Sequence, residues 1–231
     1  MADILPELYV EGKDDISVIS SLLLRHGIDT DRGRKHLQIR DKGGVDQLLG
    51  VISDAIRASS GRPVGFVLDI DIEVSNRWSA IGDRLREAGL KPPLECPPEG
   101  YVEEHPEYRH ACGVWLMPDC QTDHAKLEDL IRTLVPDRDP LWPHAQECTK
   151  KAATIVAEHN AKTSPQEEWT CFKDVDRSKA EVHAWLAWQR SPGVPFGTAL
   201  KGEILRHDSE KAKSFLCWLG RLYGIQELQN L

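Results

Sequence analysis

The sequence has no long run of apolar residues. No stretch approaches the roughly 20 consecutive apolar residues that a membrane-spanning helix needs. The N-terminus, Met-Ala-Asp-Ile-Leu-Pro-Glu, also lacks the basic segment and the apolar segment of a secretory signal peptide. We therefore expect a cytoplasmic protein without a membrane partner.

The cysteines lack the spacing of a metal site. None of the six forms a Cys-x-x-Cys pair, which argues against a thiolate zinc site. Scattered cysteines in a chain without a signal peptide are typical of reduced thiols in a reducing compartment. A single nucleophilic cysteine stays open as an alternative. The six are Cys96, Cys112, Cys120, Cys148, Cys171 and Cys217.

An excess of positive charge is also missing. The 231 residues carry a formal net charge of -8, which counts against a bulk electrostatic grip on nucleic acid. A nuclease is not excluded, because a cluster of metal-binding carboxylates adds negative charge that bound cations offset locally. The balance indicates weak binding alone, or help from a partner protein.

The sequence does contain a regular alternation of strand and helix patterns. Three short apolar segments alternate with three amphipathic helical segments. Strands that alternate with helices of this length predict an α/β fold, Rossmann-like, with a mostly parallel central sheet flanked by helices. In chain order the six segments are residues 7–11, 14–26, 37–40, 45–56, 63–70 and 78–89.

The alternation breaks at residues 91–100, where four prolines predict a loop. Residues 101–111 are polar and are interpreted as an insertion or a hairpin. A fourth strand is expected at residues 112–117, and a helix follows with its apolar stripe over residues 127–134.

Beyond Pro136 the patterns are helical only, at residues 143–161, 176–190 and 209–223, with a turn-rich break at residues 191–197. We therefore expect two parts. Residues 1–135 would form the α/β domain, with an insertion at about 91–111. Residues 136–231 would form a helical extension packed on that domain.

Two of the expected strands end in carboxylates. Glu11 follows the first strand, and Asp69 and Asp71 close the third in the run Phe66-Val67-Leu68-Asp69-Ile70-Asp71. Burying a carboxylate is costly unless a positive charge meets it, so packing gives no reason for such an ending. Ligands of open α/β sheets bind at the carboxyl ends of the strands. The pattern therefore predicts one site that holds a divalent cation through oxygen ligands.

This pattern resembles the TOPRIM fold of topoisomerases, bacterial primases, OLD-type nucleases and some RNA-processing nucleases. The likeness covers roughly residues 5–135, and the spelling from Glu11 to Asp15 is most similar to the OLD-type nucleases. A second likeness, to a family of small bacterial TOPRIM-related proteins, covers nearly the whole length. The sequence motifs that carry this second likeness are Trp115-Leu116-Met117-Pro118-Asp119, Leu127-Glu128-Asp129 and Ala184-Trp185-Leu186-Ala187-Trp188-Gln189, followed by Pro192-Gly193.

The resemblance implies a site for Mg²⁺ or Mn²⁺. Glu11, Asp69 and Asp15 would hold one ion, and Asp71 with a later glutamate would hold the other. We take Glu128 as that glutamate, because it follows the fourth strand closely. Two cations about 3.5–4 Å apart neutralise the attacking and leaving oxygens of a phosphodiester and lower the pKa of a bound water.

Several acids have a simpler alternative interpretation. Glu73 rivals Glu128 as the later ligand, because it is the third acid of the run that begins at Asp69. Asp14 and Asp15 favour the positive end of a helix in any protein. Glu128 also fits a solvated helix position. Asp119 also fits a strand stop or a helix cap.

Lys179 is the candidate catalytic residue outside the acidic strands. The resemblance to OLD-type enzymes implies a lysine that assists catalysis, and a helical wheel puts Asp176, Lys179 and His183 in one narrow sector. A basic group there would stabilise a phosphoryl oxygen. The alternative is an ion pair between Asp176 and Lys179 on a solvated face.

Two other patterns carry weaker chemistry. The turn Asp41-Lys42-Gly43-Gly44 resembles a phosphate-binding turn before a helix, but it lacks the spacing of a P-loop and equally fits a tight connection. The histidines have no metal-like spacing, and we expect them on the surface. They include His105, His110, His124 and His144.

The resemblance implies a metal-dependent nuclease that hydrolyses DNA or RNA, in an anti-phage defence setting and alongside an ATPase partner. The acidic net charge equally favours a catalytically inactive TOPRIM module that serves as an interaction platform. A nucleotidyl transferase, as in primases, is the third interpretation. The sequence leaves the oligomeric state open, a homo-oligomer included.

Overall fold

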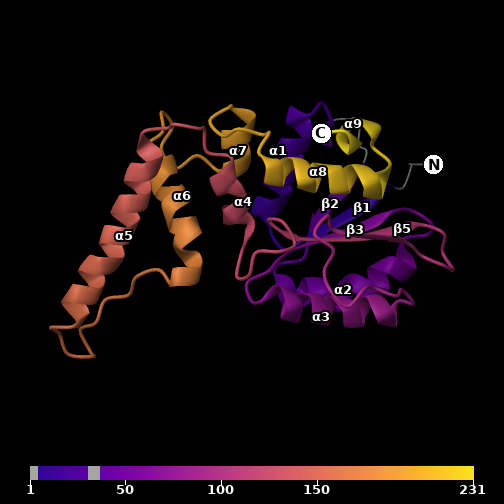
Figure 1. The fold of residues 1–231 in the computed structure, drawn as a ribbon, viewed down its shortest axis with the longest axis horizontal. Helices are drawn as coiled ribbons and strands as arrows, with labels where there is room; N and C mark the ends of the chain where they lie inside the picture. Colours follow the sequence, from indigo (N-terminus) through magenta and orange to yellow (C-terminus); the bar gives the residue numbers. More distant parts are fainter. Residues whose placement is uncertain (1–4, 31–36) are drawn as a thin grey trace.

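The computed structural model describes residues 5–30 and 37–231, so Met1 to Ile4 of the N-terminal segment considered above lie outside the described residues. Its centre is a five-stranded sheet in the order β2-β1-β3-β5-β4 (Figure 1). All neighbouring pairs are parallel except β4 with β5. The strands are β1 (Glu7–Val10), β2 (Gln38–Asp41), β3 (Val64–Asp69), β4 (Tyr101–Glu104) and β5 (Ala111–Met117).

Helices cover both faces of this sheet. Helices α2 and α3 lie on one face, and α1 and α8 lie on the other (Figure 1). This Rossmann-like α/β arrangement with additional C-terminal helices confirms the fold class expected from the alternating pattern. The helices are α1 (Lys13–Arg25), α2 (Val45–Ala58), α3 (Val74–Glu87), α4 (Leu127–Thr133), α5 (Leu141–Asn160), the 3₁₀ turn η1 (Asp174–Asp176), α6 (Arg177–Ala187), α7 (Phe196–Lys201), α8 (Glu210–Tyr223) and α9 (Gln226–Gln229).

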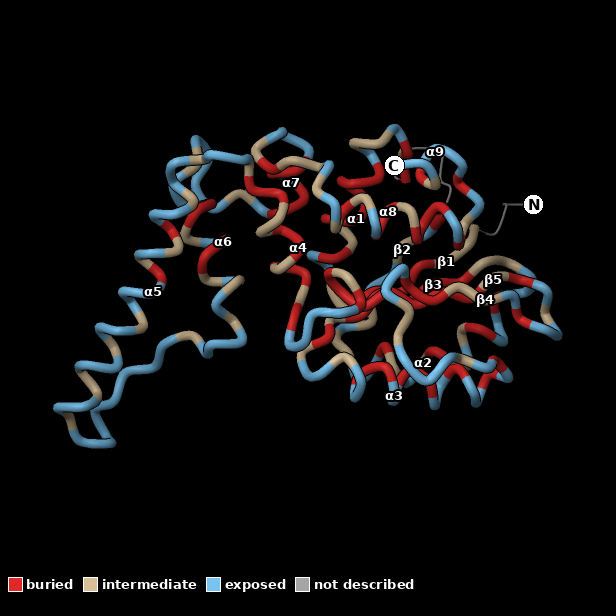
Figure 2. Tube along the Cα trace, in the orientation of Figure 1, coloured by how far each residue is buried: buried red, intermediate tan, exposed pale blue. Residues whose placement is uncertain are grey.

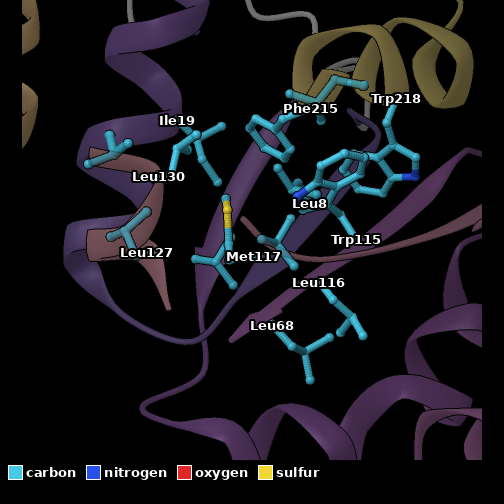
Figure 3. Packing of buried hydrophobic residues seen from close by; sticks show 14 of the residues in the cluster. Leu8, Ile19, Leu68, Trp115, Leu116, Met117, Leu127, Leu130, Phe215 and Trp218 are labelled. Carbon is cyan, nitrogen blue, oxygen red and sulfur yellow. The ribbon is translucent and has the colours of Figure 1, made fainter. Parts of the chain in front are cut away.

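The core lies where the sheet meets its helices. Every residue of β3 from Val64 to Leu68 is buried, because the strand has neighbours on both edges and helices on both faces (Figure 2). Trp115 of β5 packs against Phe215 and Trp218 of α8, with ring centroids 5.6 and 5.8 Å apart (Figure 3). Large buried aromatic rings of this kind dominate the hydrophobic stabilisation of a core.

Glycines allow the C-terminal helices to approach closely. A Cβ atom at Gly65 or Gly113 would lie 2.7 or 2.8 Å from the side chain of Leu222 in α8. Helix α7 contacts α1 in the same way, because a Cβ at Gly197 would lie 2.0 Å from Ser17 Oγ and 2.6 Å from Ser17 O. Helix α7 was not expected from the sequence, which predicted only a turn-rich break up to Gly197.

We expect Gly197→Ala to destabilise the protein by about 2–3 kcal/mol, because the added methyl group meets the backbone of α1 and neither helix can move away alone. The matched control is Gly50→Ala. Gly50 is exposed in α2 with open space around it, so alanine there should stabilise the helix by about 0.5–1 kcal/mol. Urea denaturation of the two variants measures both changes. Equal stabilities would show that the close contact carries no constraint.

The segment interpreted as an insertion or a hairpin is part of the sheet. Its first residues form β4, which pairs antiparallel with β5 at the sheet edge. The surface position expected for His105 and His110 is wrong, since their exposed fractions are 2% and 3%. His105 Nε2 lies 2.8 Å from Ala88 O, and its Nδ1 accepts hydrogen bonds from two backbone amides, so the ring stabilises the connection before β5.

Helices α5 and α6 form an arm that projects from the sheet (Figure 1). Along its 20 residues α5 buries only Ala145 and Thr149, and its outer part is exposed (Figure 2). The chain then returns through η1 and α6, where Trp185 is buried and donates a hydrogen bond to Asp139. Within residues 5–30 and 37–231, no helix is both long and apolar enough to cross a bilayer.

Candidate active site

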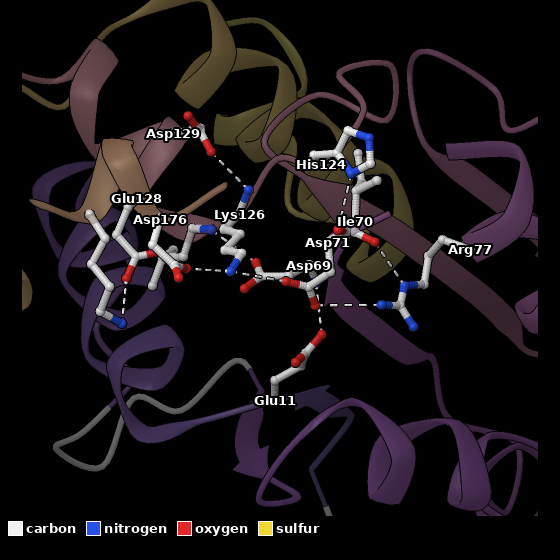
Figure 4. Close-up of polar contacts among 12 residues, drawn as sticks. Glu11, Asp69, Ile70, Asp71, Arg77, His124, Lys126, Glu128, Asp129 and Asp176 are labelled. Carbon is white, nitrogen blue, oxygen red and sulfur yellow. Dashed lines mark hydrogen bonds and ion pairs between the residues drawn. The ribbon is translucent and has the colours of Figure 1, made fainter. Parts of the chain in front are cut away.

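The acids expected to act together lie around one pocket. Glu11 follows β1, Asp69 ends β3 and Asp71 comes two residues later, and parallel strands present their carboxyl ends at the same edge of the sheet (Figure 4). Asp15 in the first turn of α1 and Glu128 in the first turn of α4 line the same pocket of about 610 Å³. Its other lining residues are Gly12, Lys13, Asp14, Asp41, Gly43, Gly44, Lys126, Leu127 and Lys179.

Backbone amides hold three of these carboxylates in place. Glu11 Oε1 accepts a hydrogen bond of 2.8 Å from the amide of Asp69, which ties the end of β1 to the end of β3. Asp69 Oδ1 accepts from the amide of Leu127 at 2.9 Å, and Asp15 Oδ2 accepts from Gly12 at 2.9 Å. In the described part of the chain, no ion pair reaches Glu11, Asp15 or Asp69. Their charge is therefore left without a cationic partner.

Burial and mutual repulsion make these three carboxyls hard to ionise. Burial raises the pKa of Asp69 well above its ordinary value, and the charges of Asp15, Glu11, Asp71 and Glu128 raise it further. Burial raises the pKa of Glu11 to about 7 and that of Asp15 to about 6, although backbone hydrogen bonds oppose both shifts. Uncompensated acids that repel one another in a pocket are characteristic of functional sites.

Asp71 differs from the other acids because it already has two cations beside it. Its Oδ2 lies 3.4 Å from the guanidinium of Arg77, and its Oδ1 lies 3.4 Å from Lys126 Nζ. Arg77 is buried and also donates to Ile70 O at 3.1 Å, so its position is constrained. Asp71 has a φ of 55°, in the left-handed region that non-glycine residues rarely adopt. Such strain persists where surrounding contacts hold it, often at functional sites.

Lys179 lies at the edge of the pocket, on the first turn of α6. Its Nζ is 2.9 Å from Glu128 Oε1. The ion pair with Asp176 that the sequence offered as an alternative does not form in this structure. Asp176 instead pairs with Lys126 at 2.8 Å. Both contacts attach the arm to the acidic edge of the sheet.

Lys126 and Arg77, the two cations beside Asp71, were not identified by the sequence analysis. Lys126 directly precedes the Leu127-Glu128-Asp129 motif, and this neighbourhood is the only local signal that it carries. Arg77 lies in the first turn of α3, six residues after Asp71. No sequence pattern distinguishes Lys126 or Arg77 from the lysines and arginines of an ordinary protein surface.

Two of the alternative acids lie outside the pocket. Glu73 caps α3 and accepts a hydrogen bond from Asn76, so of the two rivals only Glu128 faces the other carboxylates. Asp119 accepts hydrogen bonds from Gln121 and Thr122 and pairs with Lys211, as expected of a residue that ends a strand.

The glycine-rich turn before α2 borders the pocket. The amides of Gly43 and Gly44 donate to the carbonyl oxygen of Glu11. The turn therefore braces the end of β1, and these two amides are already used.

The donor set suits a hard cation, since carboxylate oxygens are the ligands that Mg²⁺ and Mn²⁺ prefer. Across residues 5–30 and 37–231, however, no group of three or more acidic, histidine or cysteine side chains already surrounds a common point. The carboxylates face backbone amides and lysines instead. Binding an ion at this edge therefore requires rotation of side chains such as Glu11 and Asp15.

The comparison with protein families gives one match. Residues 6–224 match the family described as "Protein of unknown function (DUF3226)". The chain belongs to this family. The match runs from β1 to the residue after α8, so the acidic edge and the arm both lie within the family's extent. No curated protein and no solved structure matches the chain.

We expect the metal-free protein to lose stability as the pH rises towards 8. A carboxyl whose pKa is higher in the folded state contributes stability below its unfolded pKa and loses that contribution as the pH rises through its folded pKa. For Glu11 this window runs from 4.5 to about 7. In urea denaturation with EDTA, the contribution of Glu11 to this loss should be on the order of 3 kcal/mol between about pH 5 and about pH 8, and Glu11→Gln should remove that contribution.

Added Mg²⁺ should oppose this loss, because metal binding favours the deprotonated carboxylates. The quantity to compare is the difference between the parent and Glu11→Gln at each pH, which removes the contribution of all other groups. A difference that does not change with pH would contradict the electrostatic description of the pocket.

Proposed function

We propose that this protein is a divalent-metal-dependent nuclease of TOPRIM type that hydrolyses phosphodiester bonds of DNA or RNA. One observation carries the proposal. Acids from β1, α1, β3 and α4 converge on a single pocket at the carboxyl edge of the sheet, and three of them have no ion pair within the described part of the chain. Such a concentration of uncompensated carboxylates destabilises the fold unless it serves a ligand.

In this proposal Glu11, Asp15 and Asp69 hold Mg²⁺ or Mn²⁺. The bound metal supplies a nucleophilic water of lowered pKa and neutralises charge on the phosphate. The Asp69 amide holds the side chain of Glu11 in position, and the Leu127 amide does the same for Asp69. These backbone contacts hold both side chains at the edge of the pocket, and Glu11 rotates from this position to reach an ion.

The lysines of the pocket would act on the substrate. Lys13, Lys126 and Lys179 line the same space as the acids, so a phosphate that enters meets positive as well as negative groups. Lys179 has an exposed side-chain fraction of 54% and a flexible stem, and it can reach a phosphoryl oxygen after leaving Glu128. Hydrogen-bond donors aimed at developing charge are among the largest contributions to catalysis.

An anti-phage setting and an ATPase partner follow from the resemblance to OLD-type nucleases. We include them as part of the proposal, together with the expectation that the acidic protein binds nucleic acid weakly by itself. Co-purification of this chain with its genomic neighbours tests the partner directly.

The nuclease proposal is tested by incubating the purified protein with end-labelled single- and double-stranded DNA and RNA. We expect cleavage with Mn²⁺ or Mg²⁺ and none with EDTA. Nucleotide incorporation in place of cleavage would favour the transferase interpretation. Metal binding without either activity would favour the interaction module, an outcome that the two cations already beside Asp71 make worth testing.

A further inference from the structure

Lys126 lies between two carboxylates that come from distant parts of the chain. Its Nζ is 3.4 Å from Oδ1 of Asp71, which follows β3 in the chain, and 2.8 Å from Oδ1 of Asp176, which lies in η1 of the arm (Figure 4). Its side chain is only 22% exposed. A lysine ammonium has three hydrogens and no acceptor; here it donates a hydrogen bond to Asp176 and forms an ion pair with Asp71. Lys126 therefore occupies a point on which two acids converge.

The acids that line the pocket differ in whether a cationic side chain of the protein pairs with them. Asp71 has an ammonium on one oxygen and the buried guanidinium of Arg77 on the other. Glu11, Asp15 and Asp69 have no ion pair among the described residues. Lys126 and Arg77 thus neutralise Asp71, whereas a bound cation would be needed to neutralise the other three acids.

We propose that Lys126 takes the place of a second metal ion, so that the pocket binds one divalent cation per chain. This inference rests on the proposed metal site. The single ion binds on the side of Glu11, Asp15 and Asp69. Lys126 supplies the fixed positive charge beside Asp71, and its ammonium can also donate to a phosphate oxygen in the pocket that it lines.

The charges around Asp71 favour one ion over two. A second divalent ion bound to Asp71 Oδ1 would have to displace the ammonium of Lys126, or share that oxygen with it at short range. Like charges repel strongly at such distances in a partly buried site. The two-ion arrangement predicted from the resemblance is replaced by one ion and one lysine.

The arm helps to position Lys126. Asp176 makes the shorter of the two contacts of Lys126, so η1 and α6 orient the ammonium towards Asp71. Asp176 is a positioning residue that acts through Lys126. The substitution Asp176→Asn keeps Lys126 in the sequence but removes the negative charge that orients its ammonium group.

The test is the number of Mn²⁺ ions bound per chain. We expect one ion in the parent protein, measured from the loss of the free Mn²⁺ signal in electron paramagnetic resonance. Lys126→Met frees two carboxylates that already point at one position, and we expect bound Mn²⁺ to double, with an exchange-coupled pair in the spectrum. Lys13→Met is the matched control. It removes the same charge from the same pocket, where Lys13 has no ion pair in the described structure, and should leave one ion.

The outcomes are distinguishable. Two ions in the parent would overturn the role of Lys126 while leaving the metal-dependent nuclease intact. One ion in both the parent and Lys126→Met would also overturn it, because removing the lysine would then open no site. No bound ion in the parent would overturn the proposed function and this inference together. The count in the parent does not depend on whether any variant folds.

Discussion

Asp69→Asn is expected to abolish metal-dependent cleavage, with a loss of at least about 10³-fold in rate. Asp69 ends the central buried strand, and the charges of Asp15, Glu11, Asp71 and Glu128 all raise its pKa. Asparagine keeps the shape of the side chain and an oxygen that accepts from the Leu127 amide. It removes only the negative charge that would bind the cation.

The same substitution is expected to raise stability at neutral pH. Burial and the neighbouring acids raise the pKa of Asp69 well above its ordinary value, so the charged carboxylate is disfavoured in the folded protein. A neutral amide avoids that cost. Thermal unfolding without metal, measured beside the cleavage rate, should therefore show a higher midpoint in a variant that no longer cleaves. A higher unfolding midpoint together with a lost cleavage rate is expected of a site that destabilises the fold and is needed for activity.

Asp83→Asn is the control for this experiment. Asp83 is an exposed acid of α3 that pairs with Arg86 at 2.7 Å and lies outside the pocket. Its substitution should leave both the cleavage rate and the unfolding midpoint near those of the parent. If Asp69→Asn cleaves as fast as Asp83→Asn, the acidic edge of the sheet is not the catalytic site.

Lys179→Met is expected to reduce the cleavage rate by about 10²- to 10³-fold without weakening metal binding. Lys179 forms an ion pair with Glu128, so its loss leaves that carboxylate without this partner and the affinity for Mn²⁺ unchanged or higher. The rate falls because a donor to the phosphate is lost. Cleavage kinetics and Mn²⁺ titration of the same preparation separate the two effects.

Two further variants decide whether this lysine acts on the substrate. Lys179→Arg retains a positive charge and should recover part of the rate. Lys150→Met removes an exposed lysine from α5 in the arm and should change nothing, which controls for the loss of one charge. A Lys179→Met protein that cleaves at the parent rate would reduce Lys179 to a surface partner of Glu128.

The sequence alone carried enough information for the layout of the acidic edge. The apolar run of β3 and the helical stripe of α2 are patterns within single segments, and their alternation implies parallel strands. Parallel strands end at one edge of the sheet. Acids at the ends of β1 and β3 were therefore expected at the same edge, and the direct pairing of these two strands brings the Glu11 side chain within hydrogen-bonding distance of the Asp69 amide.

Several features were beyond local patterns. Helix α7 is six residues long, and its turn-like sequence forms a helix where Gly197 can lie against α1. The burial of His105 follows from the course of the connection between β4 and β5, and its polar atoms are satisfied by backbone partners that the sequence does not identify. In both cases a contact between positions well separated in the sequence contributes, Gly197 with Ser17 and His105 with Ala88.

The partners of the charges depended entirely on the tertiary structure. Lys126 and Asp176 are 50 residues apart, and the pair exists because the arm returns α6 to the carboxyl edge of the sheet. Periodicity and strand direction are properties of short segments, so the sequence by itself determined the α/β fold and the edge where the acids gather. Which acids are neutralised and which stay free depends on distances between remote segments, and only the folded chain decided that.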